Sequence, residues 1–274
     1  MRLVAFACVL LYATSLHAGG WVHSGGKGSV GRRAPGVAWA NATSTLFQGT
    51  NDVVDLGEPA NMIRNLSNTE LTVSVWFYVT SLATQVYVVA KAAPFEPAIS
   101  WIIGVNTDGS LFAYFGSAAK TTQSAAGQIL VNTWYHASLT VRSITGTYTG
   151  NLWRNGVKVG SDVTSLGTGT ATGKSVRIGA GYVLDAPDTA LPFTGNIDEV
   201  TFWSVGMTSS ELLEIYNSAH PFNPSLHSRS ATLLHAYRMG DGDTFPTTTD
   251  RFGTAHGTCT NMVNAATNFV STVP

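Results

Sequence analysis

Short apolar segments with a period of two residues recur along this chain, and this pattern restricts it to a fold built mainly from strands. Successive side chains of a strand point to opposite faces of a sheet. In Leu71–Val79, for example, Val73, Val75 and Phe77 fall on one face, while Trp76 makes the other face apolar too. Apolar residues on both faces predict a central strand that is covered on both sides.

Turn signals separate these segments and predict antiparallel pairing between them. Asp108-Gly109 lies between two apolar runs, and so does Asn155-Gly156. Both dipeptides favour the tight two-residue turns of β-hairpins, in which glycine adopts the positive φ that most residues avoid. A further alternating segment, Trp134–Val141, predicts another strand. The chain is therefore expected to be all-β.

One segment, Thr208–Asn217, is predicted to form a short helix. Thr208 and Glu211 stand at the spacing of a capping box, in which each residue bonds the backbone of the other. Leu212, Leu213 and Ile215 provide an apolar stripe. Many short strands with regular turns and one short helix indicate a two-sheet antiparallel jelly-roll β-sandwich.

Charged residues are sparse and balanced, and this composition argues against two classes of partner. The chain has 15 Lys and Arg against 16 Asp and Glu. No basic run is present that would predict binding of nucleic acid. The most apolar run, Leu3–Leu16, is too short to cross a bilayer as a helix, which takes about 20 residues. We expect neither a nucleic-acid partner nor a membrane span.

The N-terminal part of the chain has two open interpretations. Residues 1–18 are an apolar leader with one Arg and a Leu16-His17-Ala18 end, as in a secretory signal peptide, or they are an N-terminal arm that packs against a partner. Residues 19–43 are rich in glycine and predict an arm or linker.

Several segments together resemble a known family. LTVSVWFYV, WYHASLTV, NLWRNGVKV, VRIG and FTGNIDEVTFWSVGMTSSELLEIYN follow one another as in laminin-G-like, pentraxin-like domains, and STLFQGTNDVVDLG (Ser44–Gly57) resembles the opening strand of such domains. These domains belong to the concanavalin A-type lectin/glucanase superfamily. The resemblance implies a jelly roll over residues 44–218. It does not imply an activity, because one sandwich hosts many functions.

The C-terminal part, residues 219–274, is expected to complete the sandwich and to extend outward. Leu233–Met262 resembles a segment that usually precedes the opening strand, so the order of the strands looks circularly permuted. We expect a strand at Leu233–Met239 beside Asn51–Leu56, with residues 244–274 wrapped around the outside or reaching a neighbouring subunit. The tail also resembles those of structural proteins of tailed bacteriophages.

A carboxylate pair, Asp198 and Glu199, raises the question of catalysis. Glycosidases of the resembled superfamily carry two glutamates at alternate positions of one strand, roughly E-x-D-x-E, and this pattern is absent here. Adjacent residues of a regular strand point to opposite faces. The two carboxylates are therefore not expected to flank one glycosidic bond, and the chain is expected not to be an enzyme.

Asp198 has two remaining roles. It could accept hydrogen bonds from backbone amides near Gly195-Asn196 and fix the entry of the strand. The resemblance also implies a structural Ca²⁺ site, for which Asn51 and Asp52 are the natural companions of Asp198. The acidic segment Gly240–Asp243 is expected to be a turn.

Three functions follow as hypotheses. The first is a virion surface structural protein (a capsid decoration, head-fibre or tail-associated protein) that contacts other virion proteins and copies of itself and binds host-surface glycans. The alternative is a secreted, lectin-like adhesion module that binds carbohydrate. The third is an unusual enzyme acting on polysaccharides. A sugar-stacking residue is not singled out among the candidate tryptophans Trp101, Trp134, Trp153 and Trp203.

Overall fold

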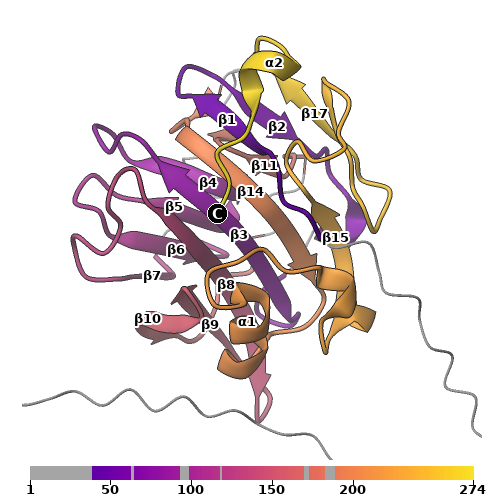
Figure 1. The fold of residues 1–274 in the computed structure, drawn as a ribbon. Helices are drawn as coiled ribbons and strands as arrows, with labels where there is room; N and C mark the ends of the chain where they lie inside the picture. The colour runs from indigo at the N-terminus through magenta and orange to yellow at the C-terminus, as the bar shows by residue number, and fades with distance from the viewer. Residues whose placement is uncertain (1–38, 63–64, 93–98, 118, 170–172, 183–188) are drawn as a thin grey trace, which may run out of the picture. The chain divides into compact units, whose positions relative to one another are not determined.

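Two antiparallel sheets face each other in this chain, as the alternation of its strands predicts (Figure 1). The computed structural model describes residues 39–62, 65–92, 99–117, 119–169, 173–182 and 189–274. The leader and most of the glycine-rich arm therefore lie outside the described residues. Within the described part, the fold is the two-sheet β-sandwich expected from the sequence.

Sheet A contains the longest strands. Its central member is β3, the segment predicted to be covered on both sides, and eight of the nine residues of β3 are buried. From one edge to the other, the sheet runs β10 (Val157–Val163), β9 (Thr147–Arg154), β8 (Trp134–Ile144), β3 (Leu71–Val79), β14 (Thr194–Trp203), β1 (Ser44–Gln48) and β18 (Phe269–Val270), and β15 (Leu233–Tyr237) also pairs with β14.

Sheet B packs against sheet A. Its order is β16 (Thr247–Thr248), β17 (Gly257–Thr260), β2 (Val53–Asp55), β11 (Arg177–Ile178), β4 (Val86–Ala92), β5 (Ile99–Val105), β6 (Leu111–Phe115) and β7 (Thr121–Gln123). A separate two-stranded sheet joins β12 (Gly181–Tyr182) and β13 (Thr189–Ala190). The helical elements are α1 (Ser209–Tyr216), α2 (Ala265–Asn268) and the 3₁₀ turns η1 (Ala60–Met62), η2 (Pro224–Leu226) and η3 (Ser230–Thr232).

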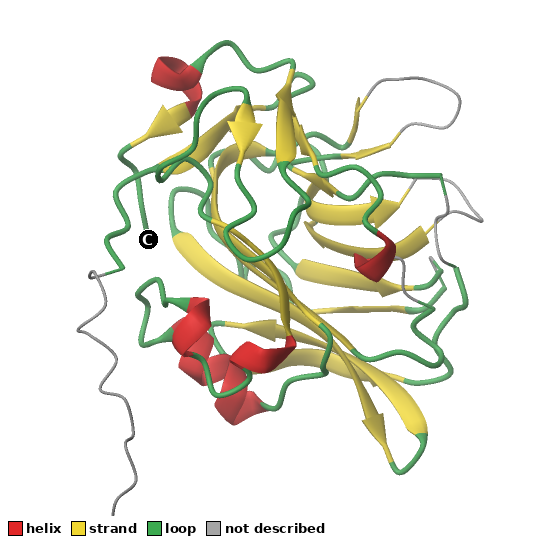
Figure 2. Cartoon of the chain, turned by 90° about the vertical axis from the view of Figure 1, so that its right-hand side faces the viewer, coloured by secondary structure: helices red, strands yellow, loops and turns green. Residues whose placement is uncertain are grey.

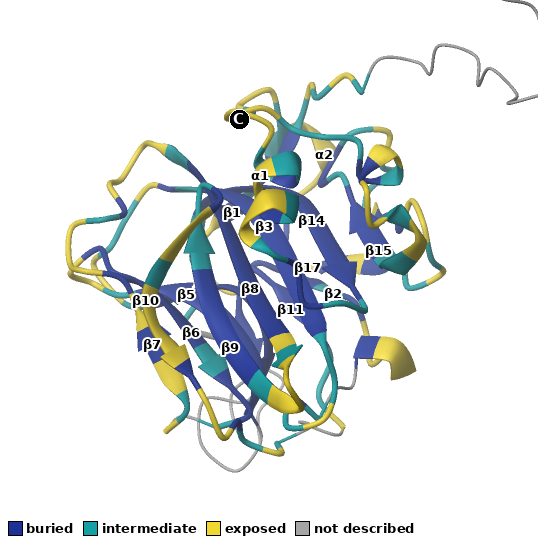
Figure 3. Cartoon of the chain, turned by 90° about the horizontal axis from the view of Figure 1, so that it is seen from below, coloured by how far each residue is buried: buried dark blue, intermediate teal, exposed yellow. Residues whose placement is uncertain are grey.

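The hydrophobic core lies between the two sheets. Each strand sends alternate side chains inward, and the largest of those that are fully buried include Phe47, Phe77, Trp101 and Phe202. Figure 3 shows the strands mostly buried, with exposure concentrated in the loops and along β10. This pattern is that of a sandwich in which the inward faces of both sheets form one core.

The outer face of sheet A carries a second, smaller apolar cluster beneath α1. Leu212 and Ile215 of the helix pack with Trp203, Met207 and other residues of this face. The predicted capping box is present, since the backbone N–H of Thr208 donates to Glu211 at 2.7 Å. Figure 2 shows α1 beside the long strands that it partly covers. The helix leaves the part of the outer face nearer β9 and β10 open.

The C-terminal segment differs from the expectation in two respects. Leu233–Tyr237 is a strand, but it pairs with β14 and not with the stretch near Asn51–Leu56. The strand that lies beside Asn51–Leu56 is β17, which pairs with β2. Residues 244–274 do not wrap the outside, because they supply β16, β17 and β18 to the two sheets. The physical reason is the length of β14, whose far half needs a partner after β1 has ended.

Candidate functional site

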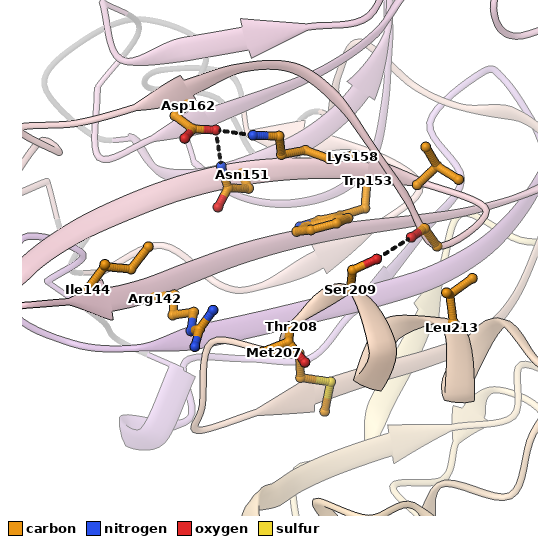
Figure 4. A pocket seen from close by; sticks show the side chains of 12 residues that line it. Arg142, Ile144, Asn151, Trp153, Lys158, Asp162, Met207, Thr208, Ser209 and Leu213 are labelled. Atoms are coloured by element: carbon orange, nitrogen blue, oxygen red, sulfur yellow. Dashed lines mark hydrogen bonds and ion pairs between the residues drawn. The ribbon is translucent and has the colours of Figure 1, made fainter.

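A pocket of about 490 Å³ lies on the outer face of sheet A, where the face is left open by α1 (Figure 4). Residues of β8, β9 and β10 and the start of α1 line it. In the view of Figure 4, the ring of Trp153 lies between Asn151, Asp162 and Lys158 on one side and Arg142 and Thr208 on the other. Trp153 and Asn151 both come from β9, whereas Lys158 and Asp162 come from its neighbour β10 and Arg142 from its other neighbour β8.

The Trp153 indole is fixed in place on the sheet. It projects from β9 on the face opposite the core residue Leu152, and its Nε1 donates to Thr140 Oγ1 of β8 at 2.9 Å. The ring is half-buried and packs against the cluster under α1. An aromatic side chain held in one orientation presents its surface to a ligand without losing rotamer freedom on binding.

Polar groups on the β10 side of the ring are ordered by one another. Asn151 Nδ2 donates to Asp162 Oδ1 at 2.8 Å, and Lys158 Nζ pairs with the same oxygen at 2.5 Å. These contacts use neither Asn151 Oδ1 nor Asp162 Oδ2, and all three residues line the pocket. Such groups accept hydrogen bonds from hydroxyls and can donate them through the amide and ammonium.

The tip of the β9–β10 hairpin and the start of α1 close one end of the pocket. Ser209 Oγ donates to the carbonyl oxygen of Gly156 at 3.4 Å. Gly156 has φ +75°, and a Cβ there would lie 2.5 Å from Leu213 Cδ2. The positive φ strains any other residue at this turn, and a Cβ would also displace the Leu213 side chain. The apolar rim includes Val157, which is 63% exposed.

The pocket suits a ligand with a flat apolar face and polar groups around its edge. The indole offers the apolar surface, and the amide, carboxylate, hydroxyl and cationic groups offer hydrogen bonds in the plane around it. Binding sites of small molecules commonly combine such an apolar surface with a few placed polar groups.

The other candidate tryptophans occupy different environments. Trp101 and Trp203 are fully buried. Trp134 is half-buried beside Tyr78, with ring centroids 5.6 Å apart. The sequence could not separate these cases, because each tryptophan lies in an alternating strand. The position of α1, which decides what the outer face leaves open, is set by tertiary packing.

The carboxylates of Asp198 and Glu199 do not point to opposite faces, contrary to the expectation. A β-bulge interrupts the pairing of β14 with β3 between Asp198 and Thr201, and Glu199 has φ +45°. The bulge falls between the two strands that share one edge of β14, since β1 pairs as far as Ile197 and β15 starts at Val200. A bulge breaks the alternation of a strand, so both side chains meet the same segment.

Residues 39–41 cover this carboxylate pair. Asn41 Nδ2 donates to Asp198 Oδ2 at 2.8 Å, and Trp39 Nε1 donates to Glu199 Oε1 at 2.9 Å. Arg238, the residue after β15, pairs with Glu199 at 3.3 Å and lies 4.2 Å from the centre of the Trp39 ring. Asp198 is 0% exposed and Glu199 6%. Under this cover, protein donors bond both oxygens of Asp198 and Oε1 of Glu199.

Burial shifts the acidity of both groups. It raises the pKa of Glu199 to about 7, although Arg238 and the Trp39 N–H favour the charged form. Burial and repulsion from Glu199 together raise the pKa of Asp198 well above its ordinary value, against the hydrogen bond from Asn41. Two like charges in one buried site cannot both ionise at low cost.

The three predicted calcium ligands are not brought together. Asp198 lies next to the start of β1, whereas Asp52 accepts a hydrogen bond from the backbone N–H of Gln48 at the other end of that strand. Thr194, the partner of Gln48, lies four residue steps from Asp198 along β14, which at ~3.3 Å per step is roughly 13 Å. Ligands of one Ca²⁺ lie ~2.3–2.6 Å from the ion. Asn51, Asp52 and Asp198 therefore do not form one site.

Other acidic groups also fall short of a metal site. No cluster of three or more His, Cys, Asp or Glu side chains with a metal-binding arrangement occurs in the described ranges. Gly240–Asp243 begins as a turn, as expected. Asp241 there accepts hydrogen bonds from Ala42 and Thr43, which ties the tail to the start of β1.

Removal of calcium is accordingly expected to leave stability unchanged. Addition of a chelator to the purified protein should not shift the melting temperature, because no set of ligands exists among Asn51, Asp52 and Asp198. The control is the same chelator saturated with Ca²⁺. A lower melting temperature with free chelator alone would show that an ion stabilises the fold.

His136 is a buried structural histidine, as its place in β8 indicates. Its Nε2 lies 2.6 Å from Ser74 Oγ, and its ring contacts Trp76 and Tyr216. Burial lowers the pKa of His136 to about 3, so the ring is neutral at physiological pH. The Ser74–His136 pair is closed to solvent and is not a candidate for nucleophilic catalysis.

Within the described part of the chain, helices that have both the length and the apolar character needed to cross a membrane are absent.

Comparison with known proteins identifies the family of the fold. The family described as the concanavalin A-like lectin/glucanases superfamily matches residues 48–213. No curated protein matches the sequence. Among solved structures, a Bacteroides ovatus protein assigned to carbohydrate binding aligns with a TM-score of 0.56 and 18% identity, over 81% of this chain and 59% of its own. The present chain thus spans less than two thirds of that protein.

Two further structures are similar. The CBM40 module of a Ruminococcus gnavus IT-sialidase, bound to α2,3 sialyllactose, aligns with a TM-score of 0.50 and 13% identity, over 64% of this chain and 96% of the module. A SAP-like pentraxin from Limulus polyphemus aligns with a TM-score of 0.47 and 15% identity, over 64% of this chain and 82% of its own. At such identities the likeness shows the fold alone. Because the family match covers more than half of the chain and the strands form the expected two-sheet sandwich, the chain belongs to the concanavalin A-like lectin/glucanases superfamily.

Proposed function

We propose that this protein is a carbohydrate-binding module and that a sugar ring stacks on Trp153. The observation that carries the proposal is the fixed, half-buried indole on the floor of an open pocket, with hydrogen-bonding side chains on both sides of it. One face of a pyranose is lined with C–H groups, and its hydroxyls project around the ring. An indole offers a large apolar surface of matching size. The carbohydrate-binding assignment of the Bacteroides ovatus protein and the CBM40 module supports the proposal.

The polar residues around Trp153 supply the specificity in this proposal. Asn151 and Asp162 stand on the β10 side, and Thr208 and Ser209 stand on the side of α1. Each can bond a hydroxyl in the plane of the stacked ring. Because Asn151 and Lys158 both bond Asp162 before a ligand binds, these side chains lose less conformational freedom on binding.

Binding without cleavage is part of the proposal. Hydrolysis of a glycosidic bond ordinarily uses two carboxyl groups on either side of that bond. Asp162 is the one carboxylate among the described residues that line the pocket, and Asn151 and Lys158 both bond it. Asp198 and Glu199 are buried beneath residues 39–41. The described lining thus offers the groups that bind a sugar, but it has one carboxylate where hydrolysis ordinarily uses two.

Replacement of the stacking residue tests the proposal. Trp153→Ala should weaken glycan binding at least tenfold, about 1.4 kcal/mol or more, because the central aromatic contact is lost. The ligand is first found with a glycan array, and its affinity is then measured by titration calorimetry. Trp134→Ala is the matched control, since it removes a half-buried tryptophan elsewhere on the protein. Equal affinity in Trp153→Ala and in the wild type would refute the assignment of the pocket.

We propose separately that the module is displayed on the surface of a virion, where host-surface glycans and other virion proteins would be its partners. The similarity of Leu233–Met262 to tails of phage structural proteins supports this location. A secreted, lectin-like adhesion module is the alternative, and there the leader of residues 1–18 would be removed. Mass spectrometry of purified particles tests the first location. Detection of the protein only in culture medium, without its leader, would favour the second.

A further inference from the structure

Arg142 is the one charged group of the pocket that has no partner among the described residues. The side chain projects from β8 into the pocket and is exposed. The two other charged residues of the lining, Lys158 and Asp162, pair with each other. The lining therefore carries one uncompensated positive charge, in a protein whose net charge is −1.

The position of Arg142 relative to the indole is set by the strand. Thr140, which accepts the hydrogen bond of the Trp153 indole, precedes Arg142 by two residues on β8. Residues two apart in a strand lie on one face, roughly 7 Å from each other. Across β8 and β9, Thr140 pairs with Asn151 and Arg142 pairs with Thr149, so Arg142 lies on the same outer face, one step beyond Asn151 as seen from the indole. The guanidinium therefore borders that end of the pocket.

The backbone at Arg142 is held firmly. A Cβ on Gly206 would lie 2.6 Å from the Arg142 Cα, so the loop before α1 packs directly on this residue. The Glu70 carboxylate lies close to Arg142 and accepts hydrogen bonds from the backbone N–H groups of Ser143 at 2.8 Å and Gly206 at 3.3 Å. Its two oxygens are engaged by the backbone, and the Arg142 guanidinium is left for a ligand.

We infer that the glycan bound at Trp153 carries an anionic group, a carboxylate or a sulfate, which pairs with Arg142. This inference rests on the proposed function. A guanidinium presents a planar fork of donors that matches two oxygens of a carboxylate or sulfate. A neutral sugar would use the indole and the polar groups near β10 but would leave the free guanidinium unpaired. The net positive charge of the lining also favours an anion.

The test compares neutral, carboxylated and sulfated oligosaccharides on one glycan array, followed by titration of the best of each class. The charged classes should bind at least tenfold more tightly than neutral glycans of the same core. Arg142→Gln should remove this difference in affinity between charged and neutral glycans of the same core. Raising the salt concentration from 50 to 500 mM should weaken only the charged ligands. Lys120→Gln, which removes the same charge outside the pocket, is the control.

The outcomes separate the two proposals. Equal binding of charged and neutral glycans that still depends on Trp153 would overturn the inference and leave the proposed function intact. Binding of charged glycans that is equally weakened by Lys120→Gln and Arg142→Gln would also overturn it, because attraction would then be nonspecific. Absence of Trp153-dependent binding to every class would overturn the proposed function and the inference with it. A preference for carboxylated over sulfated glycans, or the reverse, would identify the group.

Discussion

A chain that ends at Ser230 is expected to be unfolded and insoluble. The truncation removes β15 and β18 from sheet A and β16 and β17 from sheet B. It also removes the buried side chains of Leu233, Tyr237, Met239 and Cys259 from the core or its border. Burial of each large apolar side chain contributes about 1.5–3 kcal/mol, and the whole stability of a domain is about 5–15 kcal/mol. The stabilisation lost with these side chains is therefore comparable to the whole free energy of unfolding of the domain.

Exposed strand edges add to this effect. Without the tail, the far half of β14 loses β15, and β2 loses β17. Unpaired edges promote aggregation. Soluble yield and circular dichroism of the truncated protein measure the result, and a chain that ends at Val270, which keeps every strand, is the control. A soluble, monomeric product of unchanged melting temperature would show that the tail is an independent appendage.

The variant Glu199→Gln is expected to become progressively more stable than the wild type as the pH rises. The folded-state pKa of Glu199 is about 7, above the ordinary value of 4.5. A carboxyl group with a raised pKa favours the folded state most below pH 4.5, and this contribution falls between pH 4.5 and 7. This rise in the pKa of Glu199 corresponds to a change of about 3 kcal/mol in the free energy of unfolding. The stability of the variant relative to the wild type should thus rise by about 3 kcal/mol between pH 4 and pH 8.

Denaturant unfolding at several pH values measures this difference. Removal of the Glu199 charge also relieves the repulsion on Asp198, so both carboxyl groups act in the same direction. His136 titrates in the overlapping window, but it is present in both proteins and cancels in the comparison. The variant Trp153→Ala removes no ionisable group, so its free energy of unfolding should differ from that of the wild type by the same amount at every pH. A pH-independent difference for Glu199→Gln would mean that Glu199 is not buried under residues 39–41.

The elements of the fold that depend on local patterns could be predicted from the sequence. The alternation of Leu71–Val79 gave a central strand, Asn155-Gly156 lies at a hairpin tip, and Thr208 with Glu211 forms the capping box. Each of these depends on residues within one turn or one strand. The two-sheet sandwich followed from the number and spacing of such segments and from the family resemblance.

The features that depend on contacts far apart in the sequence could not be predicted. The strand at Leu233–Tyr237 was visible, but its partner depends on how much of β14 is left open by β1. The bulge at Glu199 arises at that same junction and reverses the expected direction of a side chain. Trp153 became distinct from the other tryptophans only through the position of α1 on the sheet. Period-two alternation carries no information about any of these.

A crystal structure of the protein with a bound glycan, chosen from the array, tests the central claim most directly. The account predicts a sugar ring stacked on the Trp153 indole, with hydroxyls bonded to Asn151 or Asp162 and an anionic group facing Arg142. A glycan bound elsewhere, for example beside Tyr78 and Trp134 or on the outer face of sheet B, with the Trp153 pocket empty at saturating ligand, would contradict it.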